Sequence, residues 1–253
     1  MPEGRRDEVP VFVVARMSSV RLPGKTLRVL GNLPVLNHVT DAMTHCSGAF
    51  RVYVVTSVDR SDDAIEQWCD EVGLVTIRGP LEDVSRRLLL AAEGLGVPAF
   101  VRISADSPLI DPQIVDHAVS LFCEDQVDLV TNTFPRTFPR GQSVEVIATG
   151  SLGEAVRAGM SQQEKEHVTR VFYDNAIAYQ IRNFVASDLR STPSDMDDLS
   201  LVHLGVDDLA DLERCERVLL ALGNDPPWRA GWVKCVVAEH SVSRFTASGP
   251  SDV

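Results

Sequence analysis

Residues 13–25 read Val-Val-Ala-Arg-Met-Ser-Ser-Val-Arg-Leu-Pro-Gly-Lys, an apolar strand pattern that runs directly into a turn. The turn carries three cations, Arg16, Arg21 and Lys25, together with two hydroxyls and a Pro-Gly pair. Backbone N–H groups at such a turn can point at an anion, and the cationic side chains can neutralise it, so the turn favours binding of a polyphosphate. We therefore expect a strand followed by a phosphate-binding loop that handles a nucleoside triphosphate. The spacing alone leaves open a solvated basic surface loop.

Short β-branched runs alternate with helical patterns on the C-terminal side of this loop. Strands are expected at 9–15, 51–56, 74–77, 99–103 and 128–131, and helices at 33–44, 61–72, 82–95 and 112–124. The helical segments place apolar residues at three- and four-residue intervals, with Ser61 and Asp111 as expected N-caps. This alternation predicts a mostly parallel sheet with helices on both faces, a three-layer α/β/α architecture.

The pattern becomes less regular after Asn132. A proline-rich loop at 134–141 precedes expected strands at 143–147, 178–184 and 201–206 and expected helices at 151–158, 162–175 and 209–222. We expect a mobile polar stretch at 187–198 and disorder from Ser241 to Val253, whereas Trp228 and Trp232 indicate a packed extension. The predicted organisation is one domain over 9–224 with a lid insert around 133–185, followed by a C-terminal extension over 225–253.

Composition narrows the class of protein. The 253 residues carry a formal net charge of −12, which argues against a general nucleic-acid or anionic-membrane surface. The five cysteines have no CxxC spacing and are expected to be buried thiols of a reducing compartment. No apolar run reaches the roughly 18 residues of a membrane span, and the N-terminus lacks an apolar signal core, so we expect a soluble cytoplasmic protein.

Two aspartates are expected at strand ends, where ligands bind in open α/β sheets. Asp106 follows the strand at 99–103, and Asp207 follows the expected strand at 201–206. Two carboxylates beside a polyphosphate loop meet the needs of Mg²⁺. Helix capping is the alternative for each of them, although Asp111 and Asp208 fit that role better.

Several other kinds of site are disfavoured by the motifs. The chain has no G-x-G-x-x-G, no G-x-x-x-x-G-K-[ST], no G-x-S-x-G and no His/Cys cluster with zinc spacing. Dinucleotide-binding, Walker-type, serine-hydrolase and zinc-site interpretations therefore lose support. His167 lies in a helical pattern that a solvated helix face would also explain.

An ordered set of motifs resembles the cytidylyltransferases of the spore-coat polysaccharide biosynthesis type, relatives of acylneuraminate and deoxy-manno-octulosonate cytidylyltransferases. The matching residues are Ala15-Arg16-Met17, Arg21-Leu22-Pro23-Gly24-Lys25, Gly31 to Leu36, Arg78-Gly79, Glu82-Asp83-Val84, Arg102-Ile103, Asp106, Pro108 to Pro112, Asn132-Thr133, Pro135-Arg136-Thr137, Pro139, Val144-Glu145-Val146, Glu166 to Thr169 and Val206-Asp207. These motifs span roughly residues 10 to 222.

The resemblance implies a nucleotide-diphospho-sugar transferase fold of the glycosyltransferase-A type and a CTP-dependent reaction. It implies that the opening loop holds the triphosphate, with Arg16, Arg21 and Lys25 as its cations, and that Asp106 and Asp207 hold Mg²⁺. Substrate contacts are expected from Ala15, Met17, Ser18, Pro23, Gly24, Asp83, Arg102, Ser104, Arg136, Arg140, Glu145 and His167. Of these, Arg102 and Ser104 are assigned to the base and ribose, and Arg136, Arg140 and His167 to the acceptor.

This chain departs from the family pattern at two places. Ser18 and Val20 stand where the family loop has glycine and threonine, which restricts the backbone and removes a hydroxyl. Arg140-Gly141-Gln142-Ser143 replaces Asp-Gly-Leu-Asp, so two acids are lost and a cation is gained. The second change favours a more anionic or otherwise unusual acceptor.

The expected function is transfer of CMP from CTP to a sugar acid, sugar phosphate or phosphonate, with release of pyrophosphate. Three alternatives stay open: another nucleoside triphosphate with a sugar phosphate, a non-catalytic nucleotide-binding homologue, and a glycosyltransferase with a nucleotide-sugar donor. A homodimer is the default assembly, because dimers are the commonest oligomers.

Overall fold

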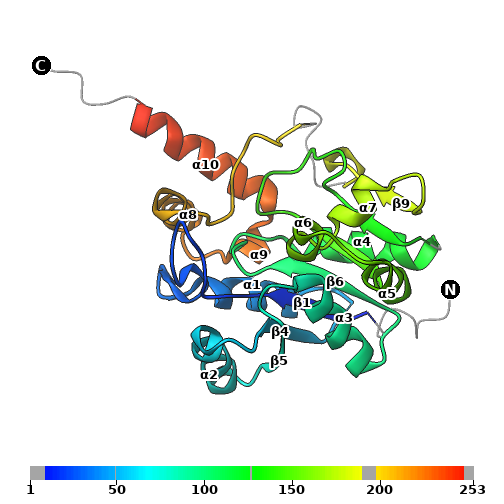
Figure 1. Ribbon diagram of the computed structural model, residues 1–253. Helices are drawn as coiled ribbons and strands as arrows, with labels where there is room; N and C mark the ends of the chain where they lie inside the picture. Colours follow the sequence, from blue (N-terminus) through cyan, green and yellow to red (C-terminus); the bar gives the residue numbers. More distant parts are fainter. Residues whose placement is uncertain (1–8, 49, 126, 190–197, 248–253) are drawn as a thin grey trace, which may run out of the picture.

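The computed structural model describes residues 9–48, 50–125, 127–189 and 198–247. Its main sheet contains β1 (Val11–Val14), β4 (Val52–Ser57), β5 (Val75–Gly79), β6 (Ala99–Ser104), β7 (Leu129–Thr131), β8 (Glu145–Ala148) and β9 (Ile181–Asn183). The strand order is β5-β4-β1-β6-β8-β7-β9 (Figure 1). Strand β8 is antiparallel to both of its neighbours, and the other neighbouring strands pair in parallel. The expected mostly parallel sheet is therefore confirmed.

Helices cover both faces of this sheet. They are α1 (Val35–Thr44), α2 (Asp63–Val72), α3 (Val84–Leu95), α4 (Pro112–Glu124), α5 (Thr149–Ala158), α6 (Gln162–Glu166), α7 (Arg170–Asp174), α8 (Leu209–Leu222), α9 (Pro227–Ala230) and α10 (Trp232–Ala247). Along β1, Val11 and Val13 join the hydrophobic cluster that includes α1, α4 and α8, whereas Phe12 joins the cluster that includes α3 and α5. This two-residue alternation is that of a strand buried on both faces, so the three-layer architecture is confirmed.

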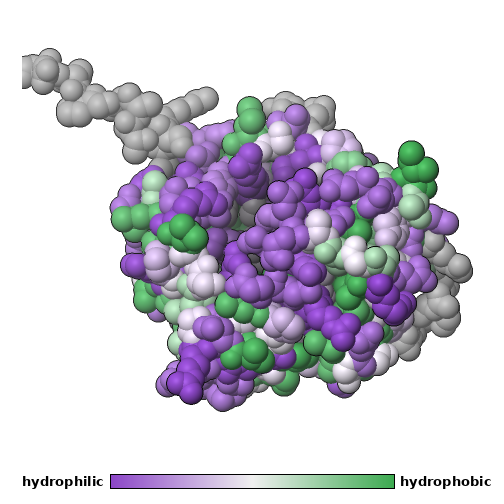
Figure 2. Space-filling view, viewed as in Figure 1, coloured by the Kyte–Doolittle hydropathy of each residue, from purple (hydrophilic) through white to green (hydrophobic). Residues whose placement is uncertain are grey.

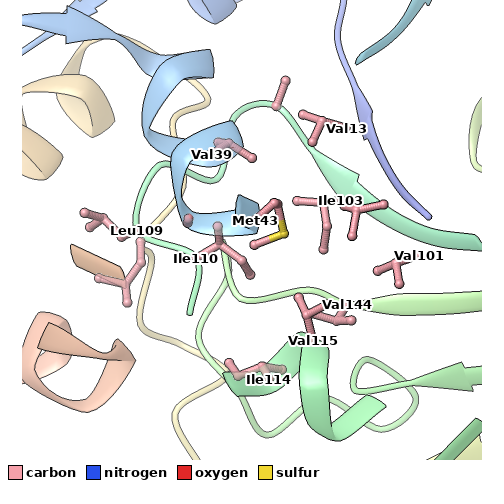
Figure 3. Packing of buried hydrophobic residues seen from close by; sticks show 14 of the residues in the cluster. Val13, Val39, Met43, Val101, Ile103, Leu109, Ile110, Ile114, Val115 and Val144 are labelled. Atoms are coloured by element: carbon pink, nitrogen blue, oxygen red, sulfur yellow. The ribbon is translucent and has the colours of Figure 1, made fainter. Parts of the chain in front are cut away.

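The hydrophobic cluster that includes α1, α4 and α8 holds the end of β6 and the chain that follows it to Asp106. Figure 3 shows Val39 and Met43 of α1 lying close to Ile103 of β6, with Ile114 and Val115 of α4 nearby. Leu109 and Ile110 follow Asp106 and are fully buried in the same cluster. The chain after β6 is therefore anchored by its own apolar side chains.

Helix capping follows the sequence in part. Asp111 caps α4 by accepting from the Gln113 N–H at 2.8 Å, and Asp208 caps α8 through a capping box with Asp211, as expected. The expected cap at Ser61 is wrong. Asp59 accepts from the Ser61 N–H at the start of a 3₁₀ turn, and α2 begins at Asp63.

Residues 201–206 do not form the expected strand. They make a single parallel bridge between Arg140 and His203, with Arg140 N donating to Val202 O at 2.9 Å and Leu204 N donating to Arg140 O at 2.7 Å. The neighbouring segment is the proline-rich loop, which offers no regular ladder of donors. Gly141, at φ +91°, lies so close that a Cβ there would be 2.6 Å from Gly205 N. The two segments therefore pack side by side as loops joined by one bridge.

Two other boundaries differ from expectation. A short hairpin of β2 (Val29–Leu30) and β3 (Leu33–Pro34) precedes α1, so the expected helix start at Leu33 is wrong. The expected helix over 162–175 is broken between α6 and α7, because Thr169 turns inward and donates to the buried carboxylate of Glu145 at 2.7 Å.

The C-terminal segment packs on the main body. Trp232 is only 1% exposed, Trp228 stacks on His45 with ring centroids 3.5 Å apart, and α10 lies beside α8 (Figure 1). The expected packing of both tryptophans is confirmed. Disorder from Ser241 is wrong as far as Ala247, where α10 ends, and 248–253 lie outside the described residues. Residues 190–197 of the expected mobile stretch also lie outside them. None of the described helices is long and apolar enough to cross a membrane.

Candidate active site

The opening loop is held in shape by its own backbone. Gly24 adopts φ +70°, its N–H donates to Met17 O at 3.0 Å, and the Lys25 N–H donates to Leu22 O at 3.1 Å. Thr26 Oγ1 donates to Arg16 O at 3.1 Å, which ties the two ends of the loop together. The expectation that amides at the Pro-Gly turn face an anion is therefore wrong for Gly24 and Lys25, because both N–H groups are used inside the loop.

The buried carboxylate of Asp62 holds the start of the same loop. Asp62 is fully buried and accepts from the Met17 N–H at 2.7 Å, the Ser57 N–H at 3.2 Å and the Ser57 hydroxyl at 2.5 Å. A buried carboxylate that accepts several hydrogen bonds fixes the groups that donate to it. Asp62 thus joins the end of β4 to the start of the loop.

Replacing Asp62 with alanine is expected to lower the free energy of unfolding by about 2–3 kcal/mol, because buried donors lose their acceptor. Urea denaturation followed by circular dichroism measures the change. Asp70→Ala, at an exposed position of α2, is the matched control and should change stability by less than about 0.5 kcal/mol. Equal stability of the two variants would contradict the supporting role of Asp62.

Lys25 lies between the two aspartates that were expected to bind metal. Its Nζ is 2.5 Å from Asp106 Oδ2, 3.2 Å from Asp207 Oδ1 and 2.9 Å from Val206 O, and Arg21 Nη2 is 3.0 Å from Asp207 Oδ1. Burial raises the pKa of Asp207, but the nearby cations, Lys25 first, outweigh this and leave the pKa below its usual value. Both carboxylates are therefore gathered around one cationic position.

This arrangement fits the expected metal. Two carboxylate oxygens and a backbone carbonyl already surround a cation, the Lys25 ammonium, and hard divalent ions such as Mg²⁺ prefer such oxygen ligands. Neither Asp106 nor Asp207 caps a helix, so the alternative interpretation of helix capping is wrong. Asp208 caps α8, and the carboxylate of Asp207 faces Lys25 and Arg21.

Two cavities meet at this cluster. The first, of about 420 Å³, is lined by five cations against three carboxylates, namely Arg16, Arg21, Lys25, Arg87 and Arg102 against Asp106, Glu166 and Asp207. The second, of about 690 Å³, lies on the other side and is lined by residues that include Arg136, Arg140, Ser143 and His203. Ser104, Asp106, His167 and Asp207 line both. Figure 2 shows hydrophilic residues gathered across the middle of one face, where the surface is hollowed.

Arg102 of β6 contributes a polar side chain to the lining of the first cavity. Its Nη1 is 2.5 Å from Glu145 Oε2, and Glu145 Oε1 accepts from Thr169 at 2.7 Å and from the Tyr173 hydroxyl at 2.8 Å. Burial alone would lower the pKa of Arg102, but Glu145 outweighs it and raises the pKa above its usual value. Glu145 is 4% exposed, so it holds Arg102 in place and does not reach the cavity itself.

Arg87 of α3 is a cavity residue that the sequence patterns did not reveal. It is 1% exposed and lines the first cavity, yet its Nε and Nη2 have no hydrogen-bond partner among the described residues. Burial lowers its pKa to about 10, so it stays charged at neutral pH. The sequence did contain a signal for Arg87, since it places a cation within the apolar stripe of α3 that includes Val84, Leu88 and Ala91.

The structure brings together most of the predicted site residues. Those that line one or both cavities are Ala15, Arg16, Arg21, Lys25, Arg102, Ser104, Asp106, Arg136, Arg140, His167 and Asp207. Those outside both linings are Met17, Ser18, Pro23, Gly24, Asp83 and Glu145. Asp83 caps α3, and Met17 packs partly buried against the core. The roles of all these residues remain predictions.

Comparison with known proteins agrees with this geometry. The family model described as cytidylyltransferase matches residues 11–218, which include β1, the opening loop, Asp106 and Asp207. The chain belongs to the cytidylyltransferase family.

Individual relatives support the family. The spore coat polysaccharide biosynthesis protein SpsF of Bacillus subtilis is 28% identical over 181 residues, covering 70% of this chain and 74% of that protein. The structure of a cytidylyltransferase from Leptospira borgpetersenii superposes with a TM-score of 0.84 at 25% identity, covering 97% and 99% of the two chains. A CMP:2-keto-3-deoxy-manno-octonic acid synthetase complexed with CTP superposes with a TM-score of 0.62 at 18% identity, covering 84% and 98%. The chain thus has the nucleotide-sugar transferase fold of this family.

Proposed function

We propose that this cytidylyltransferase-family protein transfers CMP from CTP to a small anionic acceptor, a sugar acid, sugar phosphate or phosphonate, and releases pyrophosphate. The observation that carries the proposal is the cluster of Lys25, Asp106 and Asp207 at the point where the two cavities meet. A donor and an acceptor bound in the two cavities would meet beside this cluster.

The first cavity is suited to the nucleotide. Arg16, Arg21 and Lys25 of the opening loop give it a local excess of positive charge in a chain whose net charge is −12. Cations in a partly enclosed site neutralise triphosphate oxygens far better than in water. Arg102 and Ser104 of β6 belong to the same lining, and we assign the base and ribose to them.

The second cavity is suited to an anionic acceptor. Arg136 donates to the Ser143 hydroxyl at 2.9 Å, and Arg140 is exposed at the cavity wall. Both line the second cavity, and guanidinium groups are suited to binding carboxylate or phosphate. Arg140 and Ser143 stand where the resembling family has acids, which favours an acceptor richer in negative charge.

The chemistry requires no covalent intermediate on the protein. An acceptor oxygen attacks the α-phosphorus of CTP, a new P–O bond forms, and pyrophosphate leaves with the electron pair of the broken bond. Arg16, Arg21 and Lys25 stabilise the negative charge that builds up on the leaving pyrophosphate. Asp106 and Asp207 would hold Mg²⁺, which when bound would polarise the phosphate oxygens. An ionised carboxylate or phosphate acceptor needs no general base.

The proposal is tested by measuring pyrophosphate release from CTP, UTP, GTP and ATP with pools of sugar acids, sugar phosphates and phosphonates, and by determining product masses. We expect release with CTP and with one acceptor class. Release with another triphosphate would assign a different nucleotidyltransferase. CTP binding by calorimetry, without turnover in any pool, would instead assign a non-catalytic homologue.

Replacing Arg140 with alanine is expected to raise the KM for the acceptor about 10- to 100-fold, because one charge-assisted contact of roughly 1.5–3 kcal/mol is lost. The KM for CTP should stay within about twofold. Steady-state kinetics with each substrate varied in turn measures both values. Arg170→Ala serves as a control, because Arg170 pairs with Asp174 and lies in neither cavity lining. A change confined to the KM for CTP would contradict the assignment of the second cavity.

A further inference from the structure

His203 lies beside Asp207 at the edge of the second cavity, and the proposed function gives it no role. Its Nε2 is 3.8 Å from Asp207 Oδ2, and its Nδ1 is 3.3 Å from Asp211 Oδ1. Ligand atoms of these three residues all lie within 4.8 Å of one another. The imidazole is one-quarter exposed, similar to the carboxylates of Asp106 and Asp207.

Asp211 is a support in this group, because its oxygens are already in use. Its Oδ2 accepts from the N–H groups of Asp207 at 2.9 Å and Asp208 at 3.2 Å. Its Oδ1 is paired with Arg214 and faces His203. A metal ion at Asp211 would have to displace bonds that fix the start of α8.

Asp211 therefore faces Nδ1 of the His203 ring and can orient it. Nδ1 lies 3.3 Å from Asp211 Oδ1 and 3.2 Å from Arg214 Nη2, and only the carboxylate can accept from an Nδ1–H group, because a guanidinium has no acceptor. Arg214 Nε donates to the backbone oxygen of His203 at 3.0 Å. A histidine that binds metal generally has its other ring nitrogen held by a carboxylate or a carbonyl, which orients the ring. Asp211 stands in that position, which leaves Nε2 facing Asp207.

Gly205 lies between the chain after β6 and the His203 side chain. A Cβ at Gly205 would lie 3.4 Å from the backbone oxygen of Asp106 and 3.5 Å from His203 Nε2, so both segments contact this one position. The Val206 N–H donates to Asp106 O at 2.8 Å, which joins the chain after β6 to the segment that carries His203 and Asp207. The chain after β6 and the segment at 203–207 are thus joined to each other.

We propose that His203 Nε2 is a third protein ligand of the divalent cation held by Asp106 and Asp207, and that it makes the site prefer Mn²⁺ or Co²⁺ to Mg²⁺. The inference rests on the metal site of the proposed function. Oxygen ligands alone suit Mg²⁺, whereas an added imidazole nitrogen raises affinity for first-row transition ions.

The test is Mn²⁺ binding to the full chain, measured by electron paramagnetic resonance. Electron spin echo modulation should show coupling to an imidazole ¹⁴N in the wild-type protein. His203→Gln should remove this coupling and weaken Mn²⁺ binding at least about tenfold, while Mg²⁺ binding by calorimetry changes less than about threefold. His167→Gln removes the imidazole that lines both cavities and should leave the ¹⁴N coupling intact.

Three results would overturn the inference. Bound Mn²⁺ that depends on Asp207 but shows no ¹⁴N coupling in the wild-type protein would leave the carboxylate site standing and remove only His203, and this outcome needs no folded variant. Coupling lost in His167→Gln but kept in His203→Gln would assign the other imidazole. Absence of any Mn²⁺ or Mg²⁺ binding that Asp106→Asn or Asp207→Asn weakens would reject the metal site of the proposed function as well.

Discussion

Asp106→Asn and Asp207→Asn are each expected to lower kcat/KM for pyrophosphate release from CTP on the order of 10³-fold. Each change removes a negative charge from the position that both carboxylates surround, where Lys25 Nζ lies 2.5 and 3.2 Å from them. Loss of one charge-stabilising group in an active site costs about 10²- to 10³-fold, and loss of a metal ligand costs at least as much. Steady-state kinetics with a coupled pyrophosphate assay measures the effect.

The fold should survive both changes, because each carboxylate is partly exposed and neither caps a helix. Circular dichroism and thermal denaturation check this point. Asp63→Asn is the matched control, since Asp63 pairs with Arg78, lies in neither cavity lining and should retain full activity. Full activity of either cluster variant would contradict the assignment of its carboxylate.

Arg87→Met is expected to act in opposite directions on stability and on binding. The guanidinium is buried with two unpaired nitrogens, so removing its charge should raise the free energy of unfolding by about 1 kcal/mol. A triphosphate in the first cavity would supply the missing partner, so the KM for CTP should rise about 10- to 100-fold. Urea denaturation and steady-state kinetics measure the two effects.

Arg86→Met provides the control for this pair of effects. Arg86 is the neighbouring residue on the exposed side of α3, so its loss should leave both stability and the KM for CTP nearly unchanged. Destabilisation by Arg87→Met with an unaltered KM for CTP would show that Arg87 serves packing against Gly79 and does not bind the nucleotide.

The parallel half of the sheet could be predicted from the sequence because each strand is marked locally. The β-branched runs of β1, β4 and β6 are buried on both faces, and their helices begin and end close to the expected residues. Residues 201–206 show the limit of such reasoning. They have the composition of a strand, but their neighbour is a proline-rich loop, and the sequence does not reveal which segment lies beside them.

In the candidate site, too, residues marked by local sequence could be predicted, and residues whose role depends on tertiary neighbours could not. Arg16, Arg21, Lys25 and Asp106 could be found because they follow the ends of β1 and β6. Asp207 was predicted from a strand over 201–206 that does not form, yet the structure places all five residues in the lining of one cavity. Arg87 and His203 escaped prediction because their significance depends on tertiary contacts. Glu145 was placed in the site, but it lies behind Arg102 and acts through that side chain.

Ser18 and Val20, which depart from the family loop, take different positions. Val20 is 97% exposed at the mouth of the first cavity, whereas Ser18 lies outside the lining. The loop therefore keeps its hydroxyl at Ser19, which lines the cavity. The homodimer and the division at residue 225 remain predictions.

The central claim is that CTP gives up its CMP portion beside Lys25, Asp106 and Asp207. Reaction of the full chain with CTP labelled at the α-phosphate, together with the acceptor class that supports turnover, tests it most directly. We predict that the label appears in a CMP-linked product, with one unlabelled pyrophosphate released for each product and no transfer in Asp207→Asn. Label recovered only as free CMP or CDP, or transfer that persists in Asp207→Asn, would contradict the claim.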